Sequence, residues 1–163
     1  MAWSSPMTAV AGATFTAAQF NQYVRDNLNA VCTALATGAS QIPVSTGANA
    51  IAMRTPSTAS VATSQSTAST TYTDLTTPGP AITVTTGTIA IALFSAGIAN
   101  SVSNSLTVCS VTVSGASSLA ADDAWATYLD GNAAANFSRV GVAHVITGLT
   151  AGSNTFTMKY RVG

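Results

Sequence analysis

Short runs of β-branched and apolar residues fill the chain from about Thr71 to its end, and they restrict the fold more than any other feature. Some runs alternate apolar and polar residues, others are continuous, and clusters of Gly, Pro, Asn and Ser separate them. Such runs are typical of strands, and strands without intervening helices favour a sandwich or jelly roll over βαβ units. The expected strands are TYTDL, AITVTT, IAIALFSA, SLTVCSVTVSG, AWATYL, FSRVGVAHVI and NTFTMKYRV.

One amphipathic helix is predicted near the N-terminus, after an extended arm. Thr16 followed by Gln19 is a capping-box pattern, and Phe15 and Phe20 occupy the two positions of a hydrophobic staple. The start of this helix is therefore specified twice. Its apolar stripe, with spacings of three and four residues, consists of Phe20, Val24, Leu28, Val31 and Leu35.

The stripe has two interpretations. As a heptad seam it places Asn21, Leu28 and Leu35 at a positions and both valines at d positions, and a polar a residue often fixes register and oligomeric state. Two heptads are too short for a coiled coil that is stable in water by itself. The alternative is a helix packed on its own domain or on a partner. We predict that the stripe, together with Asn21, forms the assembly interface.

These patterns divide the chain into three segments. Residues 1–38 hold the N-terminal arm and the attachment or oligomerisation helix. Residues 39–70 hold a short hairpin, QIPVSTGANAIAMRT, and a Ser/Thr-rich linker. Residues 71–163 form the β-domain. The expected fold class is mainly β: an N-terminal arm and one amphipathic helix, followed by an antiparallel, jelly-roll-like β-sandwich.

Charge is scarce in this chain. The 163 residues include five Lys and Arg and five Asp, with no Glu, so the formal net charge is zero. Without a basic patch, neither nucleic acid nor an anionic membrane is an expected partner. The longest apolar run, Ile89 to Ala99, is too short to span a bilayer. A monomer with so few charges would be poorly soluble, which indicates a symmetric assembly, and we predict a homotrimer.

Catalytic chemistry has little support in the residues. There is one histidine, His144, no Glu for an acid–base pair and no GxSxG nucleophile motif. Alternation places His144 on the same face as Val140 and Val142, so we expect it to be packed inward or against a subunit. We predict no enzymatic activity and no cofactor.

Metal binding is not expected either. Two distant cysteines, Cys32 and Cys109, do not make a zinc site, and we expect both to be reduced. Asp122, Asp123 and Asp130 match no calcium-loop spacing. The aromatic residues late in the chain are expected to be mostly core: Trp125, Tyr128, Phe137, Phe156 and Tyr160.

Three stretches of the sequence resemble virion surface proteins of tailed phages that infect actinobacteria. TFTAAQFNQYVRDNLNAV, which follows Trp3 and AVAGATF, is similar to a segment near the N-termini of those proteins. TSQSTASTTYTDLTTPGPAITVTTGT looks like the start of their β-domain, and ITGLTAGSNTFTMKYRV looks like its closing hairpin. The helix motif is specific, whereas the Thr-rich stretches are matched partly through composition. The family comprises capsid decoration proteins, head fibres and minor tail proteins, and it supplies no catalytic residues.

The resemblance implies a structural protein on the virion surface. Its expected role is that of a trimeric capsid decoration protein that binds the capsid through its N-terminal region; the alternative is a minor tail or receptor-binding protein of the same architecture. Its expected partners are copies of itself and the major capsid protein or other virion proteins. A host surface molecule is a further candidate partner. Related proteins often continue past KYRV, whereas this sequence stops at Gly163. We therefore expect the final edge of the β-domain either to be completed by a neighbouring subunit or to be left exposed.

Overall fold

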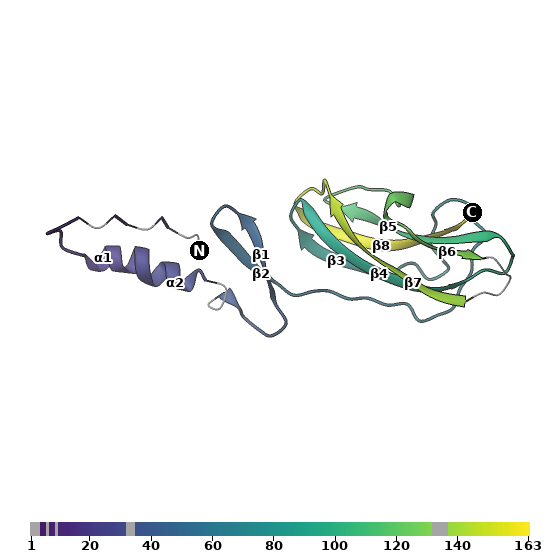
Figure 1. Ribbon diagram of the computed structural model, residues 1–163, viewed down its shortest axis with the longest axis horizontal. Coiled ribbons are helices and arrows are strands. Elements are labelled where there is room, and N and C mark those ends of the chain that lie inside the picture. The colour runs from purple at the N-terminus through teal and green to yellow at the C-terminus, as the bar shows by residue number, and fades with distance from the viewer. Residues whose placement is uncertain (1–3, 6, 9, 32–34, 132–136) are drawn as a thin grey trace. The chain divides into compact units, whose positions relative to one another are not determined.

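The computed structural model describes the chain except for residues 1–3, 6, 9, 32–34 and 132–136 (Figure 1). Two compact units are present, Met1–Pro56 and Ser57–Gly163. Residues 57–70, assigned above to the linker, belong to the second unit. The fold is mainly β with antiparallel sheets and an N-terminal helix, as expected.

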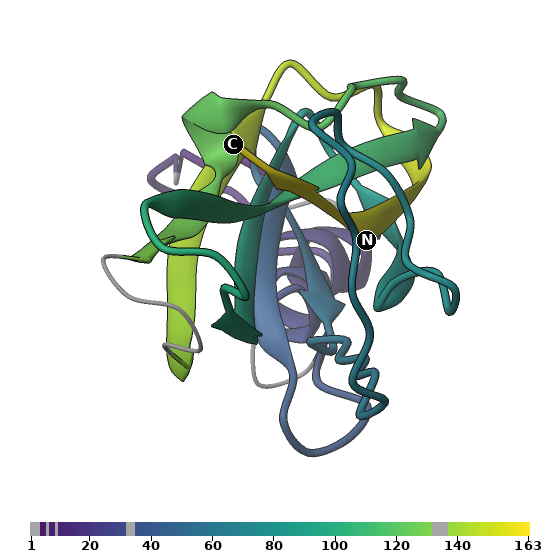
Figure 2. The same ribbon diagram turned by 90° about the vertical axis from the view of Figure 1, so that its right-hand side faces the viewer.

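The N-terminal helix begins at the predicted cap. Thr16 Oγ1 accepts a hydrogen bond from the Gln19 backbone N–H at 3.2 Å, and Gln19 Oε1 accepts one from the Thr16 N–H at 2.9 Å. The rings of Phe15 and Phe20 meet edge to face with centroids 6.1 Å apart, which completes the staple. The helix, seen end-on in Figure 2, consists of α1 (Ala17–Phe20), the π-helical η1 (Asn21–Arg25) and α2 (Asp26–Asn29).

The π-helical turn changes the geometry of the predicted stripe. A π-turn has more residues than an α-turn, so a spacing of three or four no longer keeps side chains in one line. Phe20 and Leu28 are exposed, whereas Val24 and Asn21 are half-buried. The helix is therefore amphipathic, but its apolar residues do not share one uniform environment.

The first unit also contains the hairpin that the sequence indicated. It is formed by β1 (Ile42–Gly47) and β2 (Ala50–Arg54), with Asn49 in the left-handed region at φ 56°. Paired residues lie on the same face of a hairpin. Ile42 and Val44 thus lie on one face, and Ile51 and Met53 lie on the other.

The second unit is a two-layer β-sandwich, with the strands drawn in Figure 1. One sheet has the order β3-β8-β5-β6, and β4 pairs with β7 in the other. Six of the seven expected runs are strands, and in TYTDL only Thr73 forms a bridge, to Tyr160. The strands are β3 (Ala81–Thr86), β4 (Ile89–Ala99), β5 (Ser105–Gly115), β6 (Thr127–Gly131), β7 (Phe137–Thr147) and β8 (Gly152–Val162).

The two layers share one hydrophobic core. Strand β5 supplies its inward residues Cys109, Val111 and Val113, and the small alanines and Phe94 of β4 pack against them. Burial raises the pKa of the Cys109 thiol to about 11, so this cysteine is an inert core residue. Cys32, the other predicted reduced thiol, lies outside the described residues. The sandwich is confirmed, but four plus two strands are fewer than the eight of a full jelly roll.

The last strand is not an edge strand, because the edges of its described sheet are β3 and β6. The expectation that a neighbouring subunit completes the final edge, or that it is left exposed, stays a prediction. Strand β8 lies between β3 and β5 and pairs with both. Beyond β3, the segment 57–80 continues the pairing, because Thr73 and Tyr160 exchange two backbone hydrogen bonds of 3.0 Å and Ser69 O accepts from Val162 N. The Thr-rich segment thus covers the part of β8 that β3 does not reach.

Asn154 is the main buried polar residue of the sandwich, and replacing it tests this description. Its Oδ1 accepts from Ser117 N at 2.7 Å, and its Nδ2 donates to Thr86 Oγ1 at 2.7 Å and Thr150 O at 3.0 Å. We predict that Asn154→Ala lowers the free energy of unfolding by about 2–3 kcal/mol, because it leaves buried partners unpaired. Urea unfolding at fixed protein concentration measures this. Thr83→Ala, which removes an exposed Thr–Thr contact, is the control and should cost less than about 0.5 kcal/mol.

Candidate assembly surfaces

The N-terminal unit has no hydrophobic core among its described residues. All the fully buried apolar residues of the described chain lie between Ile98 and Met158. In the first unit the one buried residue among those described is polar Asn27. A helix of this length and a two-stranded hairpin are each marginal in water without a packing partner. The described residues thus give the helix and the hairpin no apolar packing partner within this unit.

Asn27 holds the N-terminal arm to the helix. Its Oδ1 accepts from Ser4 N at 2.9 Å, while its Nδ2 donates to Ser4 O and to Tyr23 O, both at 3.1 Å. The arm thus runs back along the helix, with Ser4 beside α2 (Figure 1). The sequence analysis did not single out Asn27, because a helical Asn carries no signal for an arm that lies more than twenty residues away in sequence.

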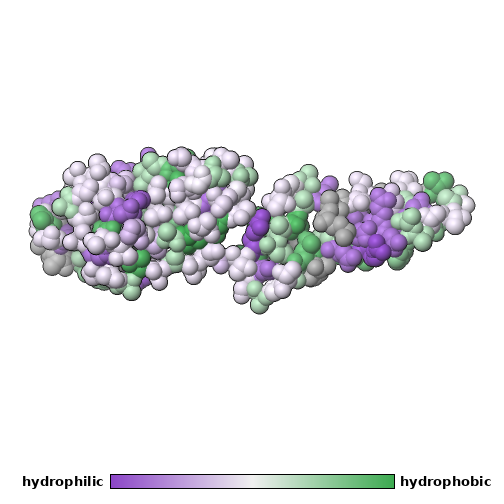
Figure 3. Space-filling model, turned by 180° about the vertical axis from the view of Figure 1, so that it is seen from behind, coloured by the Kyte–Doolittle hydropathy of each residue, from purple (hydrophilic) through white to green (hydrophobic). Residues whose placement is uncertain are grey.

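The predicted assembly stripe is largely exposed. Leu28 has 62% of its surface accessible, and Phe20 and Val31 are exposed as well. Asn21, Val24 and Leu35 are half-buried. The hairpin adds exposed Ile42, Val44 and Ile51, so both of its faces are apolar. In Figure 3 the hydrophobic residues of this unit lie beside a strongly hydrophilic stretch.

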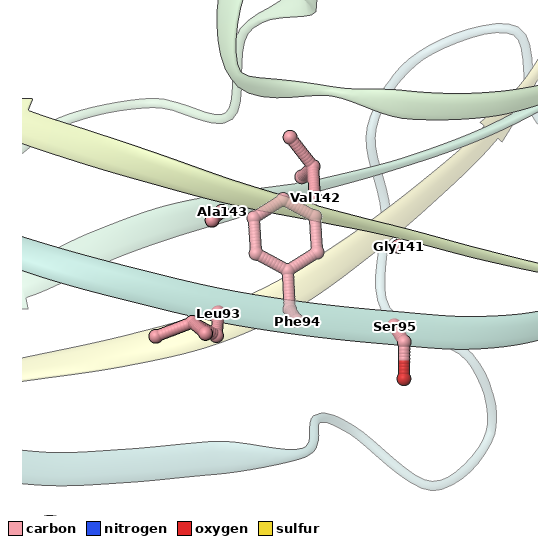
Figure 4. Close-up of a pocket in the computed structure, with 6 residues that line it drawn as sticks. All are labelled: Leu93, Phe94, Ser95, Gly141, Val142 and Ala143. Carbon is pink, nitrogen blue, oxygen red and sulfur yellow. The ribbon is translucent and has the colours of Figure 1, made fainter.

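A larger apolar surface was missed by the sequence analysis and lies on the sandwich. Strands β4 and β7, here called the β4–β7 ribbon, alternate half-buried and exposed residues along their length. Figure 4 shows the alternation at the middle of the ribbon, where Phe94 and Val142 point to one side and Leu93 and Ser95 to the other. The exposed side is apolar: its large residues are Ile89, Ile91, Leu93, Phe137 and Val145.

No enclosed pocket accompanies this surface. The hollow drawn in Figure 4 is shallow, open and lined by backbone and side chains of the ribbon itself. Among the residues with described positions, no three of His, Cys, Asp and Glu lie close enough to hold a metal ion. None of the described helices is long and apolar enough to cross a membrane.

The late aromatic residues divide between core and surface. Phe156 and Tyr160 pack against the core, as expected, whereas Tyr128 and Phe137 are exposed. The Phe137 ring lies over Gly97, where an added Cβ would approach it to 2.9 Å. Trp125 is half-buried, so two of the five lie in the core and two lie on the surface, whereas the sequence predicted mostly core.

The acidic residues serve the structure. Asp122 Oδ1 accepts from Ala124 N at the start of η2 (Asp123–Trp125), a single 3₁₀ turn. Asp123 binds the Arg161 guanidinium through both carboxylate oxygens, at 2.9 and 2.8 Å, and accepts from Tyr72 Oη at 2.6 Å. Arg161 also stacks over the Tyr72 ring, 5.4 Å from its centroid. This trio joins the segment 57–80, η2 and β8.

The trio shifts two ionisation equilibria. Hydrogen bonds from Tyr72 and Arg161 hold the pKa of the Asp123 carboxyl below its ordinary 3.8. Burial and the hydrogen bond to Asp123 raise the pKa of Tyr72 to about 12. At neutral pH Asp123 therefore stays ionised and Tyr72 stays neutral. This suits a structural contact, whereas a pair that transfers protons must change its charge.

Comparison with protein-family models, with curated proteins and with solved structures found no match. The surfaces described above are therefore assigned from their own chemistry.

Replacing Asp123 tests the trio through pH. A lowered folded-state pKa contributes stability that is complete above the unfolded value near 3.8 and is lost as pH falls through the lower folded value. We predict that Asp123→Asn lowers the melting temperature by a few degrees at most at about pH 7, since the carboxylate is exposed. The difference from wild type should shrink below about pH 4. Thermal unfolding of both proteins across this range measures it.

His144 lies on the inward face of β7 with Val140 and Val142, as expected. Its ring centroid is 6.1 Å from that of Trp125, in a tilted arrangement. We predict that His144→Gln costs about 1 kcal/mol of stability through lost packing, with no change in molecular mass by light scattering. A wild-type assembly that dissociates between about pH 7.5 and pH 5.5, while the variant does not, would identify His144 as a switch and contradict the packing role.

Proposed function

We propose that this chain is a structural subunit of a phage virion: a trimeric decoration protein that binds the capsid surface through its N-terminal unit. One observation carries the proposal. The N-terminal unit is well specified, with a double helix start and a pinned arm, yet its described residues bury no apolar core of their own. A segment specified this closely and left uncovered is suited to docking on a protein shell.

The apolar residues of the N-terminal unit define the docking surface. Leu28 and Phe20 project from the helix, and Ile42, Val44 and Ile51 project from the hairpin. Burying one such side chain contributes roughly 1.5–3 kcal/mol, so a few of them suffice for stable attachment to a multivalent shell. The nearly uncharged surface agrees with a partner that is protein rather than nucleic acid or an anionic membrane.

The resemblance of the helix segment to phage virion proteins supports the choice of shell. The same resemblance covers decoration, head-fibre and minor tail proteins. It therefore supports a phage virion protein but does not distinguish the head from the tail. We propose the head. The alternative, a minor tail or receptor-binding protein, is favoured by exposed Tyr128 on β6, because an exposed tyrosine is a common contact for glycans and host proteins. In either place the chain acts by binding rather than by turnover.

Particles that carry a Leu28→Asp change test the attachment. A charge in the middle of the apolar stripe opposes burial, so we predict that the variant is lost from purified particles while its sandwich stays folded. The amount of protein per particle is measured by quantitative mass spectrometry. Asn29→Asp places the same charge one residue away, at a position outside the stripe, and should leave incorporation unchanged.

Two outcomes of this experiment would count against the proposal. Wild-type levels of Leu28→Asp in particles would exclude attachment through the stripe. Gold-labelled antibody against the sandwich locates the chain, and label at the tail tip instead of the head would replace decoration with the tail alternative.

A further inference from the structure

The β4–β7 ribbon has an unusual position in the sandwich. Both strands are eleven residues long and pair with each other along their whole length. One face packs on the core. On the other, Leu93 is 77% exposed, Phe137 72% and Ile91 70%, which is the exposure of residues with no neighbour above them. The ribbon is thus apolar on both faces, as strands buried on both sides are.

We propose that the exposed face of the β4–β7 ribbon is the subunit interface of a homotrimer, and that its occupant is the same ribbon from two further copies of this chain. The three ribbons pack around a three-fold axis that runs along the strands. The proposal rests on the proposed function for its trimeric state alone. It assigns trimerisation to the sandwich and leaves the helix stripe free for attachment.

The chemistry of the face selects an uncharged apolar occupant. Arg139, opposite Gly97, is its one charged residue, and the face carries no acid. A charged peptide or a glycan would gain nothing from the row Ile89, Ile91 and Leu93. A second copy of this chain presents the same apolar row and is complementary in polarity without any further assumption.

The area fits a contact between copies. At the exposed fractions observed, the five large side chains present on the order of 500 Å² of apolar surface per copy. That is at the upper end of the patches found on monomers, roughly 300–600 Å². With the intervening backbone and small residues it approaches the roughly 800 Å² per partner of a stable interface. Two neighbours in a ring bury the exposed face across the full width of the ribbon. A single partner facing it would leave the outer sides of β4 and β7 exposed to solvent.

The strand edges favour a ring. In the described part of the sandwich, β4 has no strand partner other than β7, and β7 has none other than β4. Both outer edges therefore carry unpaired backbone groups, which readily pair with another strand. In a ring of ribbons whose axis runs along the strands, β4 of one copy lies beside β7 of the next. The two run antiparallel, because β4 and β7 are antiparallel within each copy.

The number three follows from closure and from side-chain size. Two ribbons supply four strands, which form a flat pair of layers rather than a closed ring, whereas three supply six. A ring of six strands has a narrower interior than the eight-stranded barrels that side chains just fill. The middle of the ribbon carries small residues on its exposed face, Ser95 opposite Gly141 and Gly97 beyond it. Ile89 and Ile91 lie toward one end of the ribbon, Phe137 lies at the other, and Leu93 lies beside the middle.

A matched pair of Leu→Lys changes tests the interface on the full chain. Light scattering at about 50 µM should give wild type three times the 16.3 kDa chain mass. We predict that Leu93→Lys reduces the mass threefold, because three ammonium groups would meet at the axis. Leu28→Lys, at an exposed leucine of the helix stripe, should remain trimeric. So should Val102→Lys, an exposed change in the loop between β4 and β5, outside the paired strands. Far-UV circular dichroism checks that each variant is folded.

Disulfide trapping provides a second measurement if Leu93→Lys does not fold. Ser95→Cys places a thiol on the exposed face at the narrow middle of the ribbon, where copies approach across the axis. Oxidation with copper phenanthroline should give covalent dimers within the trimer. Ser114→Cys, exposed at the end of β5, should not cross-link.

Clear results would overturn this assignment. A trimeric Leu93→Lys or an uncross-linked Ser95→Cys excludes the ribbon as the interface, and a wild-type monomer or dimer excludes the three-fold ring. Dissociation by Leu28→Lys alone would assign trimerisation to the helix. Failure here is separate from failure of the proposed function, because loss of Leu28→Asp from particles does not depend on which surface holds the copies together.

Discussion

A strand places successive side chains on opposite faces, and this alternation decides which residues of each sheet are buried and which are exposed. In β5 one set of alternate residues, Cys109, Val111 and Val113, enters the core between the layers. On the other face, Ser110 and Thr112 donate hydrogen bonds to Asp122 O and Leu119 O, so a loop covers that side. In β4 and β7 the same alternation leaves the second apolar set without cover. The chain thus covers both faces of β5, whereas the described residues leave the outer face of β4 and β7 exposed.

The N-terminal unit presents the same incompleteness in another form. Its local contacts are well made: a capping box, an aromatic staple and an arm fixed through Asn27. Local contacts define a shape but contribute little net stability, since most helical stability in proteins comes from tertiary packing. The described apolar residues of this unit are largely exposed, so among those residues it lacks the core of an independent domain. This agrees with the docking role proposed for it.

The sequence predicted the helix start and the strands well, but it did not predict which apolar faces are exposed. Thr16, Gln19, Phe15 and Phe20 lie within six residues, so their pattern alone predicts the helix start, and period-two runs predicted six strands. Which apolar face of a strand is covered depends on the order of strands in the sheets, and that order is not local. Leu93 and Phe94 look alike in the sequence, yet Phe94 packs on the core and Leu93 faces outward. The apolar run of β4 accordingly predicted a strand without indicating that one of its faces is exposed.

The position of strand β8 shows the same limit. The last run of the sequence predicted a strand but not its neighbours, and sheet order places it between β3 and β5. Segment 57–80 covers the rest of its outer side, although a Ser/Thr-rich composition indicated only a linker. The hydrogen bonds that join Ser69 and Thr73 to β8 use backbone groups, which composition does not reveal.

The few charges of the chain indicate where it tolerates water. Asp74, Asp123, Lys159 and Arg161 join the segment 57–80 and η2 to β8, on the part of the sandwich that the chain covers itself. The exposed face of β4–β7 has only Arg139, and neither strand contains a Lys or Pro. Soluble proteins protect free edges with such residues, because an unprotected apolar edge pairs with any available strand. An unprotected apolar ribbon favours aggregation, so this composition supports the proposal that the face is covered by further copies of the chain.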